Sequence, residues 1–159
     1  PPFSCSVCLM SRNPVRSKTL WWPLASRSGQ KVSTCVLRAF REGNDPAKGE
    51  EFIKKRNGSS DVIFVLIPGN PGTPHFYELF LRNIVASSDV VSEAYCIGHT
   101  GHTRSTTGAT ERYESFSYHD QAYHKVLALE EYIFKPGKRV VLCGHSIVSS
   151  PPPFPYRTV

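Results

Sequence analysis

The first 41 residues contain no aspartate or glutamate, although they hold seven lysines and arginines. That leaves 12 of the 19 basic side chains for the rest of the chain, where they face all 13 acidic ones. The net charge of +6 therefore belongs to the N-terminal segment, whereas a nucleic-acid-binding domain would carry its positive charge on the folded body. This distribution argues against nucleic acid as a partner.

Long apolar runs and a secretory signal pattern are also missing. No run reaches the roughly 18 apolar residues that a membrane-spanning helix needs. The five cysteines are an odd number and indicate reduced thiols in an intracellular compartment. Cys5 and Cys8 form a lone Cys-x-x-Cys without a second pair of ligands, so we expect no zinc site and no other metal or cofactor.

Three segments differ in composition. Residues 1–30 lack sustained periodicity and are predicted to be a disordered or targeting leader, because they are basic, rich in serine and free of acids. Plastid or mitochondrial targeting and a plain disordered leader fit that composition equally well. Residues 31–148 are predicted to be a partial α/β domain, and residues 149–159 an irregular proline-rich tail.

Strand-like and helix-like patterns alternate along the central segment. The expected strands are 31–40, 61–67, 90–97 and 139–143, and the expected helices are 74–86 and 118–134. This alternation predicts a mostly parallel sheet with right-handed crossovers and helices on its flanks. Ligands on such sheets bind beyond the carboxyl ends of the strands.

The second expected helix has a clear beginning and a clear end. Ser117 is the expected N-cap, Asp120 stands at the third helical position, and Pro136 stops the helix. An apolar stripe at steps of three and four predicts the buried face. The stripe consists of Tyr118, Ala122, Val126, Leu129 and Ile133.

A serine follows the last expected strand directly. Gly144-His145-Ser146-Ile147 matches the Gly-x-Ser-x-Gly elbow, in which a sharp strand-to-helix turn exposes a nucleophilic serine. The fifth position holds Val148 instead of glycine. We predict that Ser146 is the nucleophile; a simple turn after a buried strand is the alternative.

A turn rich in proline and glycine follows the strand 61–67. In the elbow-bearing fold such a loop supplies one backbone N–H of the oxyanion hole, and the residue after the nucleophile supplies the other. Asn70 and Ile147 are the predicted donors, because Pro71 has no N–H. A Pro/Gly turn without chemistry is the alternative.

These motifs resemble the lipid-droplet-associated hydrolase family. The matching segments are Ile67 to Gly72, Phe76-Tyr77, Phe80-Leu81, Gly98-His99, Gly101-His102, Gln121 with His124-Lys125, and Gly144 to Ile147. The resemblance implies an α/β-hydrolase fold and a serine hydrolase that acts on carboxylic esters of lipids, such as sterol esters. It also implies a role in lipid storage at the surface of lipid droplets or the endoplasmic reticulum.

The sequence after the elbow departs from that family. Pro151 to Pro153 cannot continue a helix, and no Asp, Glu or His follows Ser146, although the triad order is serine, acid, histidine. We therefore expect a chain truncated after its nucleophile, inactive by itself, with its last strand an exposed edge. His75, His99 and His102 lie near the expected active edge, but are not expected to replace the missing base. A non-catalytic lipid- or partner-binding remnant is the alternative function.

Overall fold

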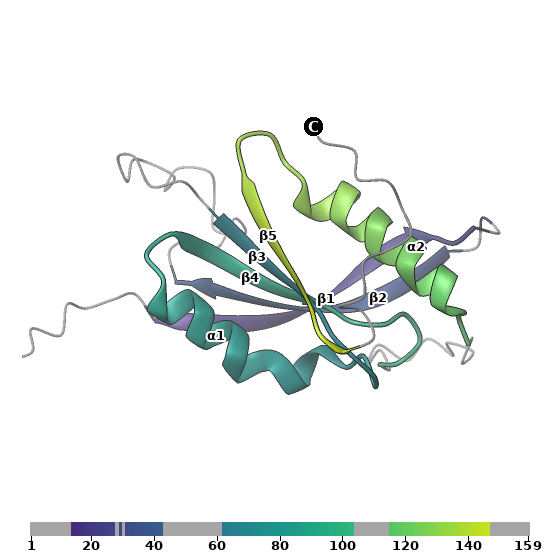
Figure 1. Cartoon of the computed structure of the whole chain (residues 1–159), viewed down its shortest axis with the longest axis horizontal. Coiled ribbons are helices and arrows are strands. Elements are labelled where there is room, and N and C mark those ends of the chain that lie inside the picture. The colour runs from purple at the N-terminus through teal and green to yellow at the C-terminus, as the bar shows by residue number, and fades with distance from the viewer. Residues whose placement is uncertain (1–13, 28, 30, 43–61, 104–114, 147–159) are drawn as a thin grey trace, which may run out of the picture.

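The computed structural model describes residues 14–27, 29, 31–42, 62–103 and 115–146, which form one five-stranded sheet with helices on both faces (Figure 1). The strands are β1 (Val15–Ala25), β2 (Lys31–Arg41), β3 (Val62–Ile67), β4 (Val91–Ile97) and β5 (Arg139–Gly144). The helices are η3 (Pro74–Tyr77), α1 (Glu78–Ser87), α2 (Tyr118–Ala128) and η4 (Leu129–Ile133). None of the helices in these residues is long and apolar enough to cross a membrane.

The sheet has the strand order β1-β2-β4-β3-β5. β3 pairs in parallel with both β4 and β5, which confirms the predicted parallel body. β2 pairs antiparallel with β1 and with β4, so two antiparallel strands extend the sheet beyond β4. β3 runs through buried apolar side chains, as expected for a central parallel strand that is covered on both faces.

The two long helices cover opposite faces of the sheet (Figure 1). α1 buries Leu81 and Val85 in a cluster with residues of β2, β3 and β4. The end of α2 and η4 bury Ala128, Leu129 and Ile133 on the other face. Helices on both faces are what right-handed crossovers to neighbours on either side of β3 require.

The N-terminal strand was not predicted. Residues 15–25, which the sequence analysis assigned to the leader, form β1 and pair with β2 along its whole length. Trp22 and Leu24 turn inward at two-residue spacing, and the Trp22 ring stacks on Tyr132 with 4.5 Å between centroids. The leader prediction is therefore wrong for this stretch, while residues 1–13 and the tail 149–159 lie outside the described residues.

The predicted buried face of the second helix is only partly correct. Leu129 and Ile133 are buried, but Tyr118 and Val126 are 47% and 43% exposed. The first half of α2 instead buries polar side chains at helical spacing, namely Gln121, His124 and Lys125. Apolar periodicity cannot find a buried face that is polar, because the burial is decided by partners on another segment.

β5 is an edge of the sheet within the described residues, since its pairing is with β3. Both of its faces expose apolar side chains: Val141 is 49% exposed and Leu142 is 55% exposed. This agrees with the expectation of an uncovered last strand. Such an edge offers backbone N–H and C=O groups to a further strand.

Candidate active site

The register of the central strands brings the two motif-bearing turns to one edge of the sheet. Ile67 at the end of β3 lies opposite Gly144 at the end of β5 in a parallel pair. β3 leads through α1 to β4 on one side, and β4 leads through α2 to β5 on the other. The connections from neighbouring strands therefore leave in opposite directions between β3 and β5, and α/β sheets bind their ligands beyond the strand ends at such a point.

Ser146 has an unusual backbone conformation. Its φ is 61°, and it alone among the described non-glycine residues has a positive φ. A side chain in this left-handed region costs free energy, and such outliers gather at functional sites. The conformation is the one expected for a nucleophile on a strained strand-to-helix turn.

Gly69 lies directly against the serine. A Cβ built at Gly69 would stand 2.6 Å from Ser146 Cβ and 3.1 Å from both His145 Nδ1 and His145 O. The His145 N–H donates to Ile67 O at 3.0 Å, which ties the elbow to the end of β3, just before the other turn. Only glycine permits the backbone of one turn to approach the serine of the other this closely.

The ring of His145 faces the first helical segment. Its Nδ1 shares a hydrogen bond of 2.8 Å with the Tyr77 hydroxyl at the end of η3, and the two rings meet edge to face. This contact agrees with the expectation that His145 is structural. It connects the elbow to the segment that follows the other turn.

The predicted oxyanion donor Asn70 lies in a tight four-residue turn. The Gly72 N–H donates to Gly69 O at 2.7 Å, and the peptide bond between Asn70 and Pro71 is cis, as in the turn class with a cis proline at its third position. Asn70 is exposed at the tip of this turn. Ile147, the second predicted donor, lies outside the described residues.

The histidines near this edge support the turn or the sheet. His102 Nδ1 donates to Pro71 O at 2.5 Å, and the His99 N–H donates to Gly72 O at 2.9 Å. His75 Nε2 shares a hydrogen bond with Thr19 of β1 at 3.0 Å. Burial lowers the pKa of His99 to about 4, with smaller contributions from Lys125 and His102, so its ring is neutral at physiological pH.

Two side chains that the sequence analysis left without a role hold the loop 98–103. Gln121 exchanges two hydrogen bonds with the backbone of Thr100, at 3.0 and 2.9 Å, and Lys125 Nζ donates to Gly98 O at 2.5 Å. Burial lowers the pKa of Lys125 to about 7. The only sequence signal for them was a polar triplet at helical spacing, Gln-x-x-His-Lys.

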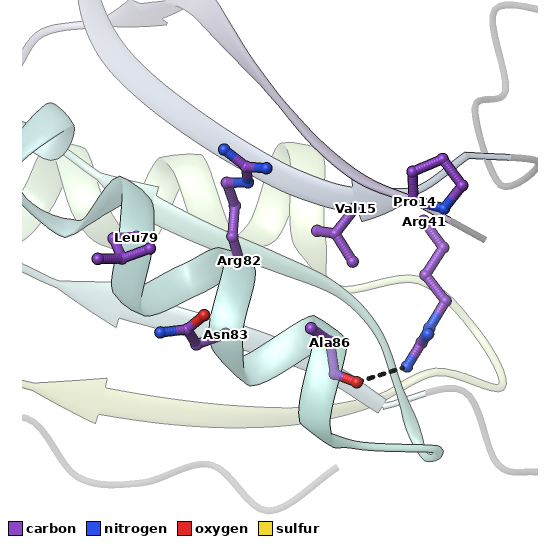
Figure 2. Close-up of a pocket in the computed structure, with 7 residues that line it drawn as sticks. All are labelled: Pro14, Val15, Arg41, Leu79, Arg82, Asn83 and Ala86. Carbon is purple, nitrogen blue, oxygen red and sulfur yellow. Dashed lines mark hydrogen bonds between the residues drawn. The ribbon is translucent and has the colours of Figure 1, made fainter. Parts of the chain in front are cut away.

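A separate cavity lies at the opposite edge of the sheet. It has a volume of about 350 Å³ and lies between α1 and the outer strands β1 and β2 (Figure 2). Its lining is Pro14, Val15, Arg41, Leu79, Arg82, Asn83 and Ala86. Arg41 there donates to Val85 O at 2.6 Å and to Ser88 O at 2.8 Å, so it caps the C-terminus of α1.

The central part of the chain matches a known family. A model described as lipid-droplet associated hydrolase matches residues 60–149. The chain is 33% identical over 107 residues to a lipid droplet-associated hydrolase of Dictyostelium discoideum, covering 63% of this chain and 34% of that protein. It is 28% identical over 94 residues to the Gallus gallus protein of the same description, covering 54% and 29%. The chain thus spans about a third of the length of these relatives.

A solved structure has the same fold. The peroxisomal α/β-hydrolase Lpx1 of Saccharomyces cerevisiae superimposes with a TM-score of 0.51 at 15% sequence identity. The match covers 86% of this chain and 38% of the yeast chain. The predicted fold class is therefore confirmed: the chain forms part of an α/β-hydrolase fold.

Proposed function

This chain belongs to the lipid-droplet-associated hydrolase family, and on that premise we propose that it carries the nucleophile and the oxyanion turn of a serine hydrolase for carboxylic esters of lipids. The observation that carries the proposal is the left-handed Ser146 at the end of β5 with Gly69 packed against it. That arrangement favours acyl transfer over a plain turn, because a turn without chemistry would not need a strained serine at this edge.

The proposed reaction follows from the site. Ser146 Oγ attacks the ester carbonyl and loses its proton to a base, and the backbone N–H groups of Asn70 and Ile147 stabilise the negative oxygen. The C–O bond to the alcohol then breaks as the alcohol takes a proton, which leaves an acyl-serine. Water cleaves that ester and restores the serine.

The acid and the histidine of the triad are proposed to belong to sequence that family members have and this chain lacks. Residues 147–159 contain no Asp, Glu or His, and His75, His99 and His102 have the other contacts described above. We therefore expect this chain alone to turn over esters very slowly, at a rate at most about 10³–10⁴ times that of uncatalysed hydrolysis in water.

The same observations support a second candidate, a non-catalytic remnant that binds lipid or a partner. A chain that retains the turn but has Val148 where the elbow has glycine suits binding as well as slow chemistry. In either case we propose the surface of lipid droplets or the endoplasmic reticulum as its place and lipid storage as its process. The family description supports the lipid droplet.

Fluorophosphonate modification distinguishes the two candidates. We expect slow modification confined to Ser146, located by peptide mass spectrometry after long incubation, and none at that position in Ser146→Ala. Gly69→Ala should reduce the rate by about 10² or more, because its Cβ would displace the serine. Equal modification of Ser146 and of exposed Ser117 would refute an activated serine and favour the binding remnant.

A further inference from the structure

The buried polar face of α2 points toward the loop that follows β4 and not into an apolar core. We infer that Gln121 and Lys125 are positioning residues: through the loop 98–103 and its two histidines, they hold the oxyanion turn 69–72 against Ser146. The inference rests on the function proposed above for that turn and serine. It gives a role to Gln121 and Lys125 of the Gln-x-x-His-Lys segment and to the Gly-His segments.

The first link joins α2 to the loop. Gln121 accepts from the Thr100 N–H at 3.0 Å and donates to Thr100 O at 2.9 Å, so its amide binds both backbone polar groups of one loop residue. Lys125 Nζ donates to Gly98 O, which also accepts from the Thr34 hydroxyl of β2 at 2.8 Å. Helix, loop and sheet therefore meet at the carbonyl of Gly98.

The second link joins the loop to the turn. The His99 N–H donates to Gly72 O and His102 Nδ1 donates to Pro71 O, so two successive carbonyls of the turn are held. The His99 ring also lies on Gly72, where an added Cβ would stand 2.3 Å from His99 Cδ2. The rings of His99 and His102 meet edge to face at 5.3 Å. The turn cannot move toward the loop, and its carbonyls are anchored from that side.

The third link joins the turn to the serine. Gly72 and Gly69 close the turn through their own hydrogen bond, and Gly69 also lies against Ser146, where an added Cβ would stand 2.6 Å from Ser146 Cβ. Only the four residues of the turn, 69–72, therefore separate the loop from the elbow, and a displacement of the loop should also displace Ser146. Because a misplacement of about 1 Å can cost 10²-fold in rate, the position of this turn matters for the proposed chemistry.

A purely structural role would have a different signature. Gln121 and Lys125 could simply attach α2 to the sheet, as the apolar residues of η4 do. Replacing either residue would then destabilise the whole fold without selectively loosening the turn. The matched comparison is Ile133→Val, which removes a buried methyl group from the same helical segment without touching the loop.

Hydrogen exchange of the full chain tests the inference. Gln121→Met keeps the side-chain length and Lys125→Met keeps all but its last atom, and both remove the hydrogen bonds, whereas Lys135→Met removes an exposed lysine that bonds to Glu131 O. Under native conditions we expect peptides over 68–77 and 98–103 to exchange about tenfold faster in the first two variants, the effect of one or two lost hydrogen bonds. In Ile133→Val and Lys135→Met, the exchange rates of these two peptides relative to the rest of the chain should be the same as in the wild type.

Two outcomes would overturn the inference. One is loss of protection in 98–103 while 68–77 remains as protected as in the wild type. The other is an Ile133→Val variant that equals the Gln121→Met and Lys125→Met variants in stability and speeds the exchange of 68–77 to the same extent. The rate of fluorophosphonate modification of Ser146, expected to fall with the protection of 68–77, is a separate measurement. If wild-type Ser146 is never modified, the proposed function fails while the exchange result still decides the positioning role.

Discussion

The two helices that flank the sheet are positioned by different forces. α1 rests on buried apolar side chains, Leu81 and Val85, and has no side-chain cap at its N-terminus. α2 begins with a complete capping box at Ser117 and buries polar groups that bond to a loop. The comparison shows that one helix serves the core, whereas the first half of the other serves the edge of the sheet where the candidate site lies.

The largest effect is expected from breaking the apolar attachment of α1. Leu81 is fully buried, so Leu81→Ala should lower the free energy of unfolding by about 2–5 kcal/mol through lost contacts and the cavity it leaves. Urea denaturation should show a lower midpoint with an unchanged slope. Leu79→Ala on the same helix is the matched control, since Leu79 is 70% exposed and the change should cost less than about 0.5 kcal/mol.

A second prediction uses the titratable amine that α2 buries, that of Lys125. Burial lowers the pKa of Lys125 to about 7 from 10.5, so between these values the unfolded chain binds a proton that the folded chain does not. The free energy of unfolding should therefore rise with pH from 7 to 8.5, by up to about 1.4 kcal/mol per pH unit. Lys125→Met should remove this rise.

The comparison with Lys125→Met is needed because other groups titrate at higher pH. Burial raises the pKa of Cys35 to about 11 and that of Cys96 to about 12, and both thiols therefore reverse the trend above pH 9. Measurements at pH 7, 7.5, 8 and 8.5 stay below that range. Identical slopes for wild type and variant would mean that Lys125 is solvated in solution, which contradicts its burial.

Sequence patterns predicted the apolar parts of the fold well. β3 and β5 were found because continuous apolar runs of strand length bounded by Gly and Pro leave few alternatives. Ser117 was found because a cap followed three residues later by an acid is a local signal. The two candidate turns were found because the carboxyl ends of parallel strands share an edge.

Features that depend on distant partners were missed. Residues 15–25 were assigned to a leader because they lack sustained periodicity and are basic and free of acids; the strand becomes visible only through its pairing with β2. The buried Gln121 and Lys125 are invisible to apolar periodicity, since their partners lie over 20 residues away in the loop 98–103. The contact of Gly69 with Ser146 depends on the register of β3 and β5, which no local pattern states.

The smallest effect is expected at the cap of α2, and it shows how far the two helices differ. The Ser117 hydroxyl accepts from the Asp120 N–H at 3.2 Å, and Asp120 accepts from the Ser117 N–H at 3.1 Å. Ser117→Ala should lower the free energy of unfolding by about 1 kcal/mol. Because Gln121 lies one turn beyond the cap, fraying there should also speed hydrogen exchange in 98–103. Ser87→Ala is the control: it removes an exposed hydroxyl that donates to Asn83 O at the C-terminal end of α1, and it should leave the exchange of that loop unchanged. If both variants leave the exchange of 98–103 unchanged while Ser117→Ala is less stable, the loop does not depend on the first turn of α2, and the contrast between the helices is confined to Gln121 and Lys125 themselves.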